Sequence, residues 1–233
     1  MDIKSIKSQF PIFKNKINGN PLTYLDNANS AQKPVRVIDR ISNFYSKEFS
    51  NVGRSVHSLA VTATNRFEET RDLVKKYINA NAREEIIFTK NATEAINLVA
   101  STYGEKFINK DDEILITELE HHANYVPWHF IREKKGAVIK FAKCNDKGEV
   151  EIDEIKKLIT NRTKIISITH LSNVTGAILP IKKIVDLAKT KNIPVLVDGC
   201  QGAPHLEIDM QTLGCDFYAI SCHKMYGPTG VGV

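Results

Sequence analysis

Polar side chains that could do chemistry follow five short apolar runs of this chain, at the point where each run ends. In chain order the polar groups are Lys90–Glu94, Glu120–Asn124, His170–Asn173, Asp198–Gln201 and Ser221–Lys224. If the apolar runs are strands of one parallel sheet, their carboxyl ends meet at one edge, which is where such sheets bind ligands. We therefore expect these hydroxyl, imidazole, amide, carboxylate and amine groups to converge on a single site.

Each of these residue types suits one part of an aldehyde cofactor that carries a phosphate and a pyridine ring. The amine of Lys224 can form a Schiff base with an aldehyde. The carboxylate of Asp198 can keep a pyridine nitrogen protonated, which makes the ring an electron sink. The first turn of a helix that carries Ser or Thr hydroxyls suits a phosphate dianion. An imidazole such as that of His121 can stack on the ring or move protons near neutral pH.

Each residue also has a simpler explanation when it is taken alone. Asp198 could cap a loop, and Lys224 could be an ordinary solvated lysine. A metal site at His121 and His122 is disfavoured, because adjacent side chains point apart on a helix or a strand. One cofactor, pyridoxal 5'-phosphate (PLP), accounts for all of these positions together, and no single alternative does.

The elements that must position these residues alternate along the chain. Strands are predicted at Ile86–Thr89, Asp112–Ile116, Val138–Phe141, Lys164–Thr169, Pro194–Val197 and Phe217–Ser221. Helices are predicted over Ala95–Val99, Tyr125–Lys135, Ile152–Ile159 and Ile181–Lys189. Apolar strands that alternate with amphipathic helices indicate the α/β class, with a mostly parallel sheet covered on both faces.

The N-terminal third has a different pattern. Residues 1–20 are predicted to form an arm, and Ile38–Tyr77 is predicted to be largely helical. Asn18–Pro21 is a turn signal between them. The last residues, Gly227–Val233, are typical of a loop that enters a strand, so we expect the large domain, 21–233, to be incomplete at its C-terminus.

Composition excludes several classes of protein. The 233 residues are 42% apolar and 25% charged, as in ordinary globular proteins. The formal charge of +5 is modest and dispersed, which disfavours nucleic acid as a partner. No apolar run suggests a secretory signal or a membrane span, and the four cysteines have neither zinc nor redox spacing. We expect a soluble, cytoplasmic protein with reduced cysteines.

The motifs together resemble one family. They are Tyr24–Ala28, Gln32–Pro34, Asn51–Arg54, Ala92–Glu94, Glu120–Asn124, Ser172–Val174, Asp198–Gln201, Ser221–Lys224 and Tyr226–Gly230. The chain is similar to class V PLP enzymes of fold type I, and most of all to cysteine desulfurases of the SUF iron–sulfur assembly system. The resemblance runs from about Phe10 onward. It implies a three-layer large domain, without the C-terminal small domain.

The resemblance also implies a role for each matching residue. Lys224 would hold PLP covalently and move the substrate proton, and His121 would stack over the ring and assist that transfer. Asp198 would pair with the ring nitrogen, and Gln201 would donate to the ring phenolate. The phosphate would be bound by Thr93, Ser221 and His223, and the substrate would be met by Asn173 and Arg54. The implied partners are L-cysteine, a sulfur-acceptor protein and a second copy of the chain.

Some positions depart from the family pattern. Gly53 stands where a histidine is common, Asn29 stands where alanine is usual, and Cys200 and Cys222 replace small residues. We interpret these two cysteines as buried small side chains rather than nucleophiles. The family's nucleophilic cysteine and carboxylate-binding arginine lie in the C-terminal part that this sequence does not include. Alternatives therefore remain: a selenocysteine lyase, a kynureninase-like enzyme, or a non-catalytic PLP-binding remnant.

Overall fold

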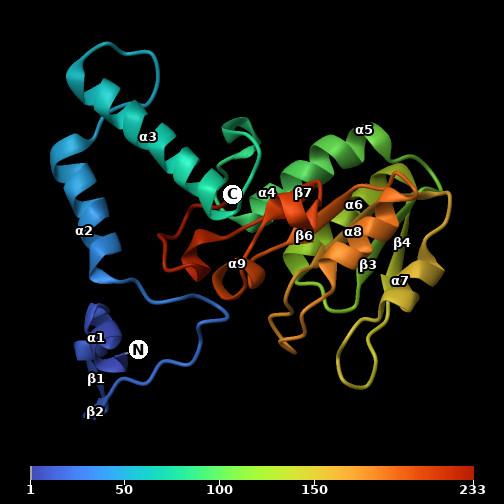
Figure 1. Cartoon of the computed structure of the whole chain (residues 1–233), viewed down its shortest axis with the longest axis horizontal. Coiled ribbons are helices and arrows are strands. Elements are labelled where there is room, and N and C mark those ends of the chain that lie inside the picture. The colour runs from blue at the N-terminus through green and yellow to red at the C-terminus, as the bar shows by residue number, and fades with distance from the viewer. Residues whose placement is uncertain (1) are drawn as a thin grey trace. The chain divides into compact units, whose positions relative to one another are not determined.

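The computed structural model describes residues 2–233 and divides them into two compact units (Figure 1). The first unit contains the residues up to Ile86 together with Cys222–Thr229. The second unit contains Ile87–Ser221 together with Gly230–Val233. The segment Cys222–Thr229 therefore leaves the second unit and returns to it.

The second unit is built on a five-stranded parallel sheet. Its strands are β3 (Glu113–Thr117), β4 (Val138–Ala142), β5 (Thr163–Thr169), β6 (Val195–Asp198) and β7 (Phe217–Ala219). They lie in the order β4-β3-β5-β6-β7, and every neighbouring pair is parallel. The predicted α/β class and parallel sheet are confirmed, and the carboxyl ends of all five strands lie at one edge of the sheet.

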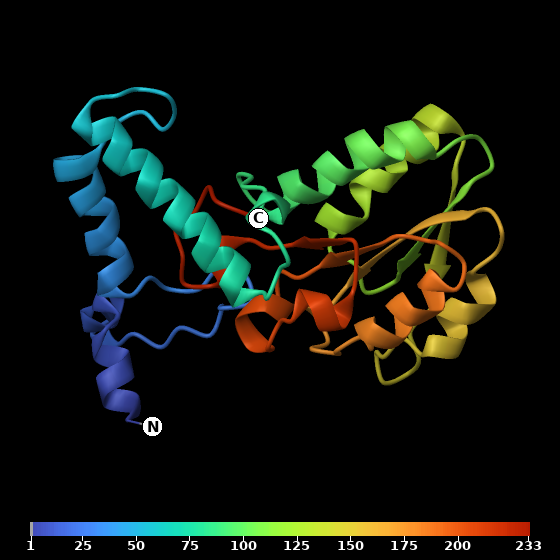
Figure 2. The same cartoon turned by 45° about the horizontal axis from the view of Figure 1, so that its top comes forward.

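Helices cover both faces of this sheet (Figures 1 and 2). The helices are α4 (Ala92–Val99), α5 (Glu105–Phe107), α6 (Val126–Lys135), α7 (Ile152–Leu158), α8 (Ile181–Lys189), α9 (Gly202–His205) and α10 (Met210–Leu213). A π-helical turn, η4 (Ala100–Gly104), joins α4 to α5, and a 3-10 turn, η5 (His122–Asn124), precedes α6. Because strand side chains alternate between the faces, Leu115 packs with Ile155 and Val185 on one face. Ile114 and Ile116 contribute to a second core, around Trp128, on the other face.

The first unit contains the N-terminal arm and the long helices. Its elements are α1 (Ile3–Ser8), η1 (Pro11–Lys14), β1 (Lys16–Ile17), β2 (Asn20–Pro21), α2 (Val35–Asn43), η2 (Phe44–Glu48), α3 (Ser58–Tyr77), η3 (Arg83–Glu85) and η6 (Cys222–Lys224). The predicted turn closes the hairpin of β1 and β2, with positive φ angles of 52° at Asn18 and 79° at Gly19. Left-handed residues in both central positions suit the twist of a hairpin.

One of these segment predictions is wrong and another is confirmed. Ile86–Thr89 is not a buried strand of the sheet: Thr89 forms one antiparallel bridge to Gly232, and Ile87 is 57% exposed. Among residues 2–233 this bridge is isolated, so the segment forms no ladder with the five-stranded sheet. The prediction that Ile38–Tyr77 is largely helical is confirmed by α2, η2 and α3, with one interruption between η2 and α3, where Gly53 has a φ angle of 146°. Only glycine adopts that conformation readily.

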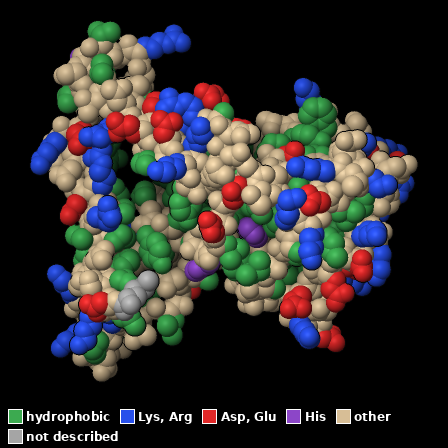
Figure 3. Space-filling view, viewed as in Figure 1, with side chains coloured by type: hydrophobic (Ala, Val, Ile, Leu, Met, Phe, Trp, Pro, Cys, Tyr) green, Lys and Arg blue, Asp and Glu red, His purple; other side chains and the backbone are tan. Residues whose placement is uncertain are grey.

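Surface properties are those of a mixed-charge protein. Figure 3 shows Lys and Arg side chains interspersed with Asp and Glu over the visible face, without one dominant patch. Across residues 2–233, no helix combines the length and the apolar character needed to cross a membrane.

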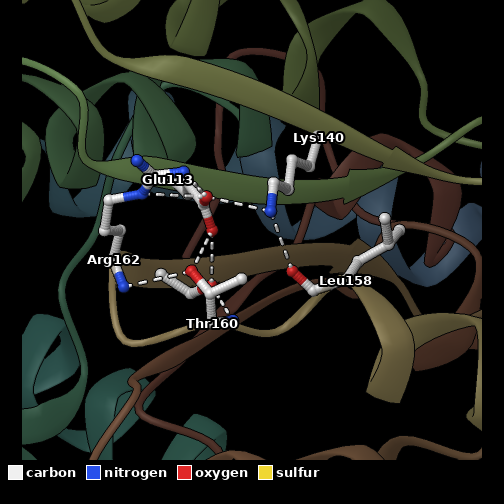
Figure 4. Close-up of polar contacts among 6 residues, drawn as sticks. Glu113, Lys140, Leu158, Thr160 and Arg162 are labelled. Carbon is white, nitrogen blue, oxygen red and sulfur yellow. Dashed lines mark hydrogen bonds and ion pairs between the residues drawn. The ribbon is translucent and has the colours of Figure 1, made fainter.

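A buried carboxylate, that of Glu113, joins β3 to β4 and to the segment before β5 at the edge of the sheet opposite the strand carboxyl ends (Figure 4). Glu113 begins β3 and is 0% exposed. Its Oε1 lies 2.9 Å from Lys140 Nζ and 3.0 Å from an Arg162 nitrogen, and its Oε2 accepts from Thr160 Oγ1 at 2.6 Å. Burial by itself would raise the pKa of Glu113, but the hydrogen bonds from Thr160, Lys140 and Arg162 hold that pKa at about 2.

Replacing this carboxylate should therefore cost stability in a pH-dependent way. Because the folded pKa of about 2 lies below the usual 4.5, the charge stabilises fully above pH 4.5, and its contribution is lost as the pH falls toward 2. We expect Glu113→Gln to lower the free energy of unfolding by on the order of 3 kcal/mol at neutral pH. The difference from wild type should shrink below pH 4.5. Denaturant unfolding at several pH values measures it, and a difference that stays constant down to pH 3 would contradict the assignment.

Candidate active site

Asp198 ends β6 at the carboxyl edge of the sheet and is 4% exposed. Its Oδ1 accepts from the Cys200 N–H at 3.0 Å, and its backbone oxygen accepts from the His170 N–H at 2.9 Å. Because side-chain and backbone groups both fix this residue, its carboxylate is held at the edge where a ligand would bind.

The loop after β6 is packed too tightly to accept side chains at its glycines. A Cβ added at Gly199 would lie 2.0 Å from Tyr218 Cε1, and one at Gly202 would lie 2.7 Å from the Tyr218 hydroxyl oxygen. Tyr218 is held in turn by His170, whose Nδ1 lies 2.9 Å from the tyrosine hydroxyl oxygen. Gln201 lies within this loop, is 5% exposed and immediately precedes α9. Tyr218 and His170 therefore fix the path of the segment that carries Asp198 and Gln201.

The start of α4 meets the segment that follows β7. Ser221 Oγ accepts from the Ala92 N–H at 2.9 Å, so a hydroxyl lies at the N-terminus of this helix. Thr93, in the first turn, is exposed, and Asn91 caps the helix by accepting from the Glu94 N–H at 2.8 Å. Amide groups and hydroxyls gathered at a helix N-terminus favour a phosphate. This part of the second unit has the donor types that a phosphate requires.

His121 lies in the turn between β3 and η5 and is exposed. Its Nδ1 accepts from the Ala123 N–H at 3.1 Å, so the neutral ring carries its proton on Nε2. The preceding residue, Glu120, accepts from Thr117, Asn124 and the backbone of Thr169. Burial, with a smaller contribution from the charge of Asp198, raises the pKa of Glu120 to about 8, although these hydrogen bonds oppose the shift.

Asn173 lies in the exposed turn that follows β5. The turn is closed by an antiparallel bridge between Leu171 and Ile178. Ser172 Oγ accepts from the Val174 and Thr175 N–H groups, each at 3.2 Å. The second unit thus carries six predicted site residues on segments that follow its strands or begin α4: Asp198, Gln201, Thr93, Ser221, His121 and Asn173.

The first unit carries the other three predicted site residues. Lys224 is half-buried in η6 and follows Ser221 by three positions in the sequence. His223 has its Nδ1 3.1 Å from Ser30 Oγ, and its backbone oxygen accepts from Lys33 Nζ at 2.8 Å. Burial lowers the pKa of His223, and the charges of Lys224 and Lys33 lower it further. Arg54 is exposed in the loop before α3.

Sequence reasoning missed three residues that shape this edge of the second unit. Glu120, His170 and Tyr218 all act through partly buried contacts between elements far apart in the chain. Glu120 and His170 fall within the polar groups that follow strands, so their place after a strand was the one signal in the sequence that could have identified them. Tyr218 lies inside a strand, and nothing in the sequence distinguishes it from a core residue.

The cysteines of the described residues are free thiols. Burial raises the pKa of Cys215 to about 12, and burial also raises the pKa of Cys222, although the charge of Lys33 opposes this second shift. Cys200 and Cys222 are half-buried. A protonated thiol is a poor nucleophile, which favours the interpretation of Cys222 as a packing residue.

Alkylation should separate these thiols by their thiolate content. At pH 8 we expect iodoacetamide to modify Cys144 faster than Cys215 and Cys222, because a raised pKa leaves little thiolate. Peptide mass mapping after timed quenching measures the rates in the folded chain. Modification of Cys222 at the rate of Cys144 would mean that Cys222 is an activated thiol after all.

The fold and the site define a class. Residues 23–233 match the family model described as aminotransferase class-V. The chain therefore belongs to the aminotransferase class-V family, whose members related to this chain are PLP-dependent enzymes. The resemblance to class V PLP enzymes that the motifs indicated is confirmed.

Curated relatives narrow the class. The chain is 45% identical over 233 residues to a probable cysteine desulfurase from Halalkalibacterium halodurans, and it covers 57% of that protein. It is also 45% identical over 232 residues to a cysteine desulfurase from Synechococcus elongatus, of which it covers 37%. The chain thus spans roughly a third to somewhat over a half of the relatives that it matches.

Solved structures agree with the curated relatives. The whole chain superposes on the cysteine desulfurase CsdA from Escherichia coli with a TM-score of 0.89 and 37% identity, covering 57% of that chain. It superposes on the apo cysteine desulfurase from Thermococcus onnurineus with a TM-score of 0.91 and 34% identity, covering 56% of that chain. The fold is therefore that of fold-type I PLP enzymes.

Proposed function

We propose that this chain is the cofactor-binding part of a PLP-dependent cysteine desulfurase. The reaction converts L-cysteine to L-alanine and transfers the sulfur, as a persulfide, toward iron–sulfur cluster assembly. The observation that carries the proposal is the donor set at the carboxyl edge of the second unit, in a chain 45% identical to cysteine desulfurases.

The residues at that edge fit PLP. A phosphate dianion suits the hydroxyl of Ser221 and the N-terminus of α4, which meet at 2.9 Å. A cationic ring nitrogen suits the carboxylate of Asp198, which is 4% exposed. A side chain at position 199 or 202 would clash with Tyr218, so glycine at both positions allows this segment to keep its path. The donors match the cofactor in charge and in type.

Each site residue has a part in handling the cofactor and the substrate. When bound, PLP supplies an aldehyde and a ring that stabilises negative charge at the substrate α-carbon. The Lys224 amine binds the aldehyde and afterwards moves the proton at that carbon, and Asp198 holds the proton at the ring nitrogen. His121 covers the ring and assists proton movement through its ring nitrogens. Gln201 hydrogen-bonds the ring oxygen.

Phosphate and substrate contacts are proposed for the remaining residues. Thr93, Ser221 and His223 bind the phosphate, and the lowered pKa of His223 suits a neutral donor there. Asn173 lies near the substrate carboxylate, and Arg54 meets the substrate at the mouth of the site. Both are exposed, as residues that meet an incoming substrate must be.

A substrate panel tests the proposal. The chain loaded with PLP is mixed with L-cysteine, L-selenocysteine or L-kynurenine, and changes in the visible spectrum are recorded together with sulfide, selenide and alanine. We expect L-cysteine to perturb the cofactor spectrum. A response to L-kynurenine alone would replace the proposal with a kynureninase-like enzyme, and a response restricted to L-selenocysteine would indicate a lyase. A loaded chain that responds to none of them would favour the non-catalytic alternative.

The same proposal extends to the setting of the protein. We place it in the cytoplasm, with a sulfur acceptor of the SUF system and a second copy of the chain as partners. What supports a dimer is the exposed apolar surface of the first unit, where Leu25 is 90% exposed, Val56 94% and Tyr45 67%. Light scattering of the purified chain at several concentrations measures its mass, and a strict monomer would exclude the dimer.

A further inference from the structure

Glu120, a carboxylate outside the predicted site residues, joins three elements of the second unit at its carboxyl edge. Its Oε1 accepts from Thr117 Oγ1 at 2.6 Å and from the Thr169 N–H at 3.0 Å. Its Oε2 accepts from Asn124 Nδ2 at 2.6 Å. Thr117 ends β3, Thr169 ends β5, and Asn124 ends η5. One side chain therefore holds two strand ends and the turn between β3 and α6.

The partner amide is fixed in one orientation. Asn124 is 0% exposed, and its Oδ1 accepts from Ser167 Oγ at 2.5 Å and from Trp128 Nε1 at 3.5 Å. An indole nitrogen can only donate, so rotating the Asn124 amide would set donor against donor at Trp128 and leave its oxygen facing Glu120. The pattern has one arrangement in which every group is satisfied, and an unmet buried group costs about 1–3 kcal/mol.

This network borders two predicted cofactor residues. His121 follows Glu120 directly, and its backbone oxygen accepts from the Asn124 N–H at 2.8 Å. Both ends of the turn that carries His121 are therefore held by the pair of Glu120 and Asn124. Thr169, held by Glu120 through its backbone, is the register partner of Asp198 in the neighbouring strand.

We propose that Glu120 is a positioning residue for the cofactor site, and that its pattern of hydrogen bonds, rather than its charge, fixes the His121 turn and the end of β5 beside Asp198. The proposal rests on the proposed function for the identity of the cofactor. The part of the proposal that concerns the position of His121 does not depend on the proposed function. In this role Glu120 acts through its protein donors Thr117, Thr169 and Asn124 rather than on a reacting atom.

A reciprocal exchange of amide and carboxylate separates pattern from charge. Glu120→Gln alone places an amide nitrogen opposite Asn124 Nδ2, so two donors face each other. Adding Asn124→Asp restores the bond in the reverse direction. The new carboxylate still accepts from Ser167 and Trp128, while the new amide oxygen still accepts from Thr117 and Thr169. Every hydrogen bond is then satisfied with no charge at position 120.

Two readouts follow the exchange in the full chain, both recorded at pH 9 so that Glu120, whose pKa is raised to about 8, is a carboxylate in the wild type. The first is the NMR signals of the His121 ring, recorded without cofactor, and the second is PLP affinity from absorbance titration. We expect Glu120→Gln to shift the His121 signals and to weaken PLP binding about tenfold, as one unmet buried donor implies. The double variant should restore the signals and bring the affinity within about threefold of wild type. Glu113→Gln is the matched control, because it removes a buried carboxylate at the opposite edge and should change neither readout.

The outcomes decide the proposal separately from the function. It is overturned if Glu120→Gln changes neither readout, or if a folded double variant stays as impaired as the single one. If Glu120→Gln does not fold, the double variant and Thr117→Val, which removes one donor to Glu120 and the acceptor of the Leu119 N–H, decide it in the same way. If wild type binds no PLP, the proposed function fails, while the His121 signals still test the positioning role.

Discussion

Asp198→Asn is expected to weaken PLP binding on the order of 100-fold or more, because it removes the buried negative charge opposite the ring nitrogen. Losing one partner of a buried ion pair leaves the other uncompensated, which costs about 3–5 kcal/mol. The amide keeps the shape of the side chain, and its oxygen can still accept from the Cys200 N–H, which lies 3.0 Å from Asp198 Oδ1. Absorbance titration of the folded variant with PLP measures the affinity.

Stability distinguishes an electrostatic effect of this variant from a structural one. We expect the unfolding midpoint of Asp198→Asn to stay close to that of wild type, since the hydrogen bond to Cys200 is retained. Circular dichroism during thermal unfolding checks this. An unchanged PLP affinity in a folded variant would mean that Asp198 does not carry the ring nitrogen, and the assignment of the cofactor site would have to move.

Gly232→Ala is expected to disrupt the start of α4 and to lower both stability and PLP affinity. A Cβ at Gly232 would lie 2.5 Å from both Cα and C of Asn91 and 2.8 Å from the Ile220 backbone oxygen. Contacts this short against backbone cannot be relieved by a rotamer change, so the Thr89–Gly232 bridge and the α4 cap must shift. Overpacking of this kind costs about 1–3 kcal/mol.

Gly104→Ala provides the matched control, since it is the same chemical change at a place where the new Cβ meets side chains. There the nearest atoms are Ile131 side-chain carbons at 3.3 Å and a Trp128 ring carbon at 3.5 Å. We expect only a small change in the free energy of unfolding from denaturant titration, and no change in PLP affinity. Equal losses in both variants would show that Gly232 has no special role beside the start of α4.

Much of the second unit could be predicted because its elements carry local signals. The apolar spacing of Ile181–Lys189 predicted α8 with the observed bounds. The parallel strand order placed Asp198 and the His121 turn at the carboxyl edge. The strand prediction for Ile86–Thr89 was wrong because an apolar run does not reveal whether neighbouring strands can pair with it, and among the described residues the segment forms an isolated bridge from Thr89 to Gly232.

The supporting contacts of the site could not be predicted, for a physical reason. The supporting role of Glu120 depends on hydrogen bonds from Thr117, Thr169 and Asn124, and these donors come together only when the sheet is assembled. The hydrogen bond of His170 to Tyr218 likewise joins positions 48 apart in the chain. Residue type identifies which groups can do chemistry, while tertiary packing decides which groups hold them.

The most direct test of the central claim is a visible absorbance spectrum of the purified chain with added PLP, before and after borohydride reduction, with mass mapping of the product. We predict a reducible chromophore and a single PLP adduct on Lys224, absent from Lys224→Ala. In a chain shown to be folded, the absence of any adduct, or an adduct fixed on another lysine such as Lys33, would contradict the assignment of the cofactor site.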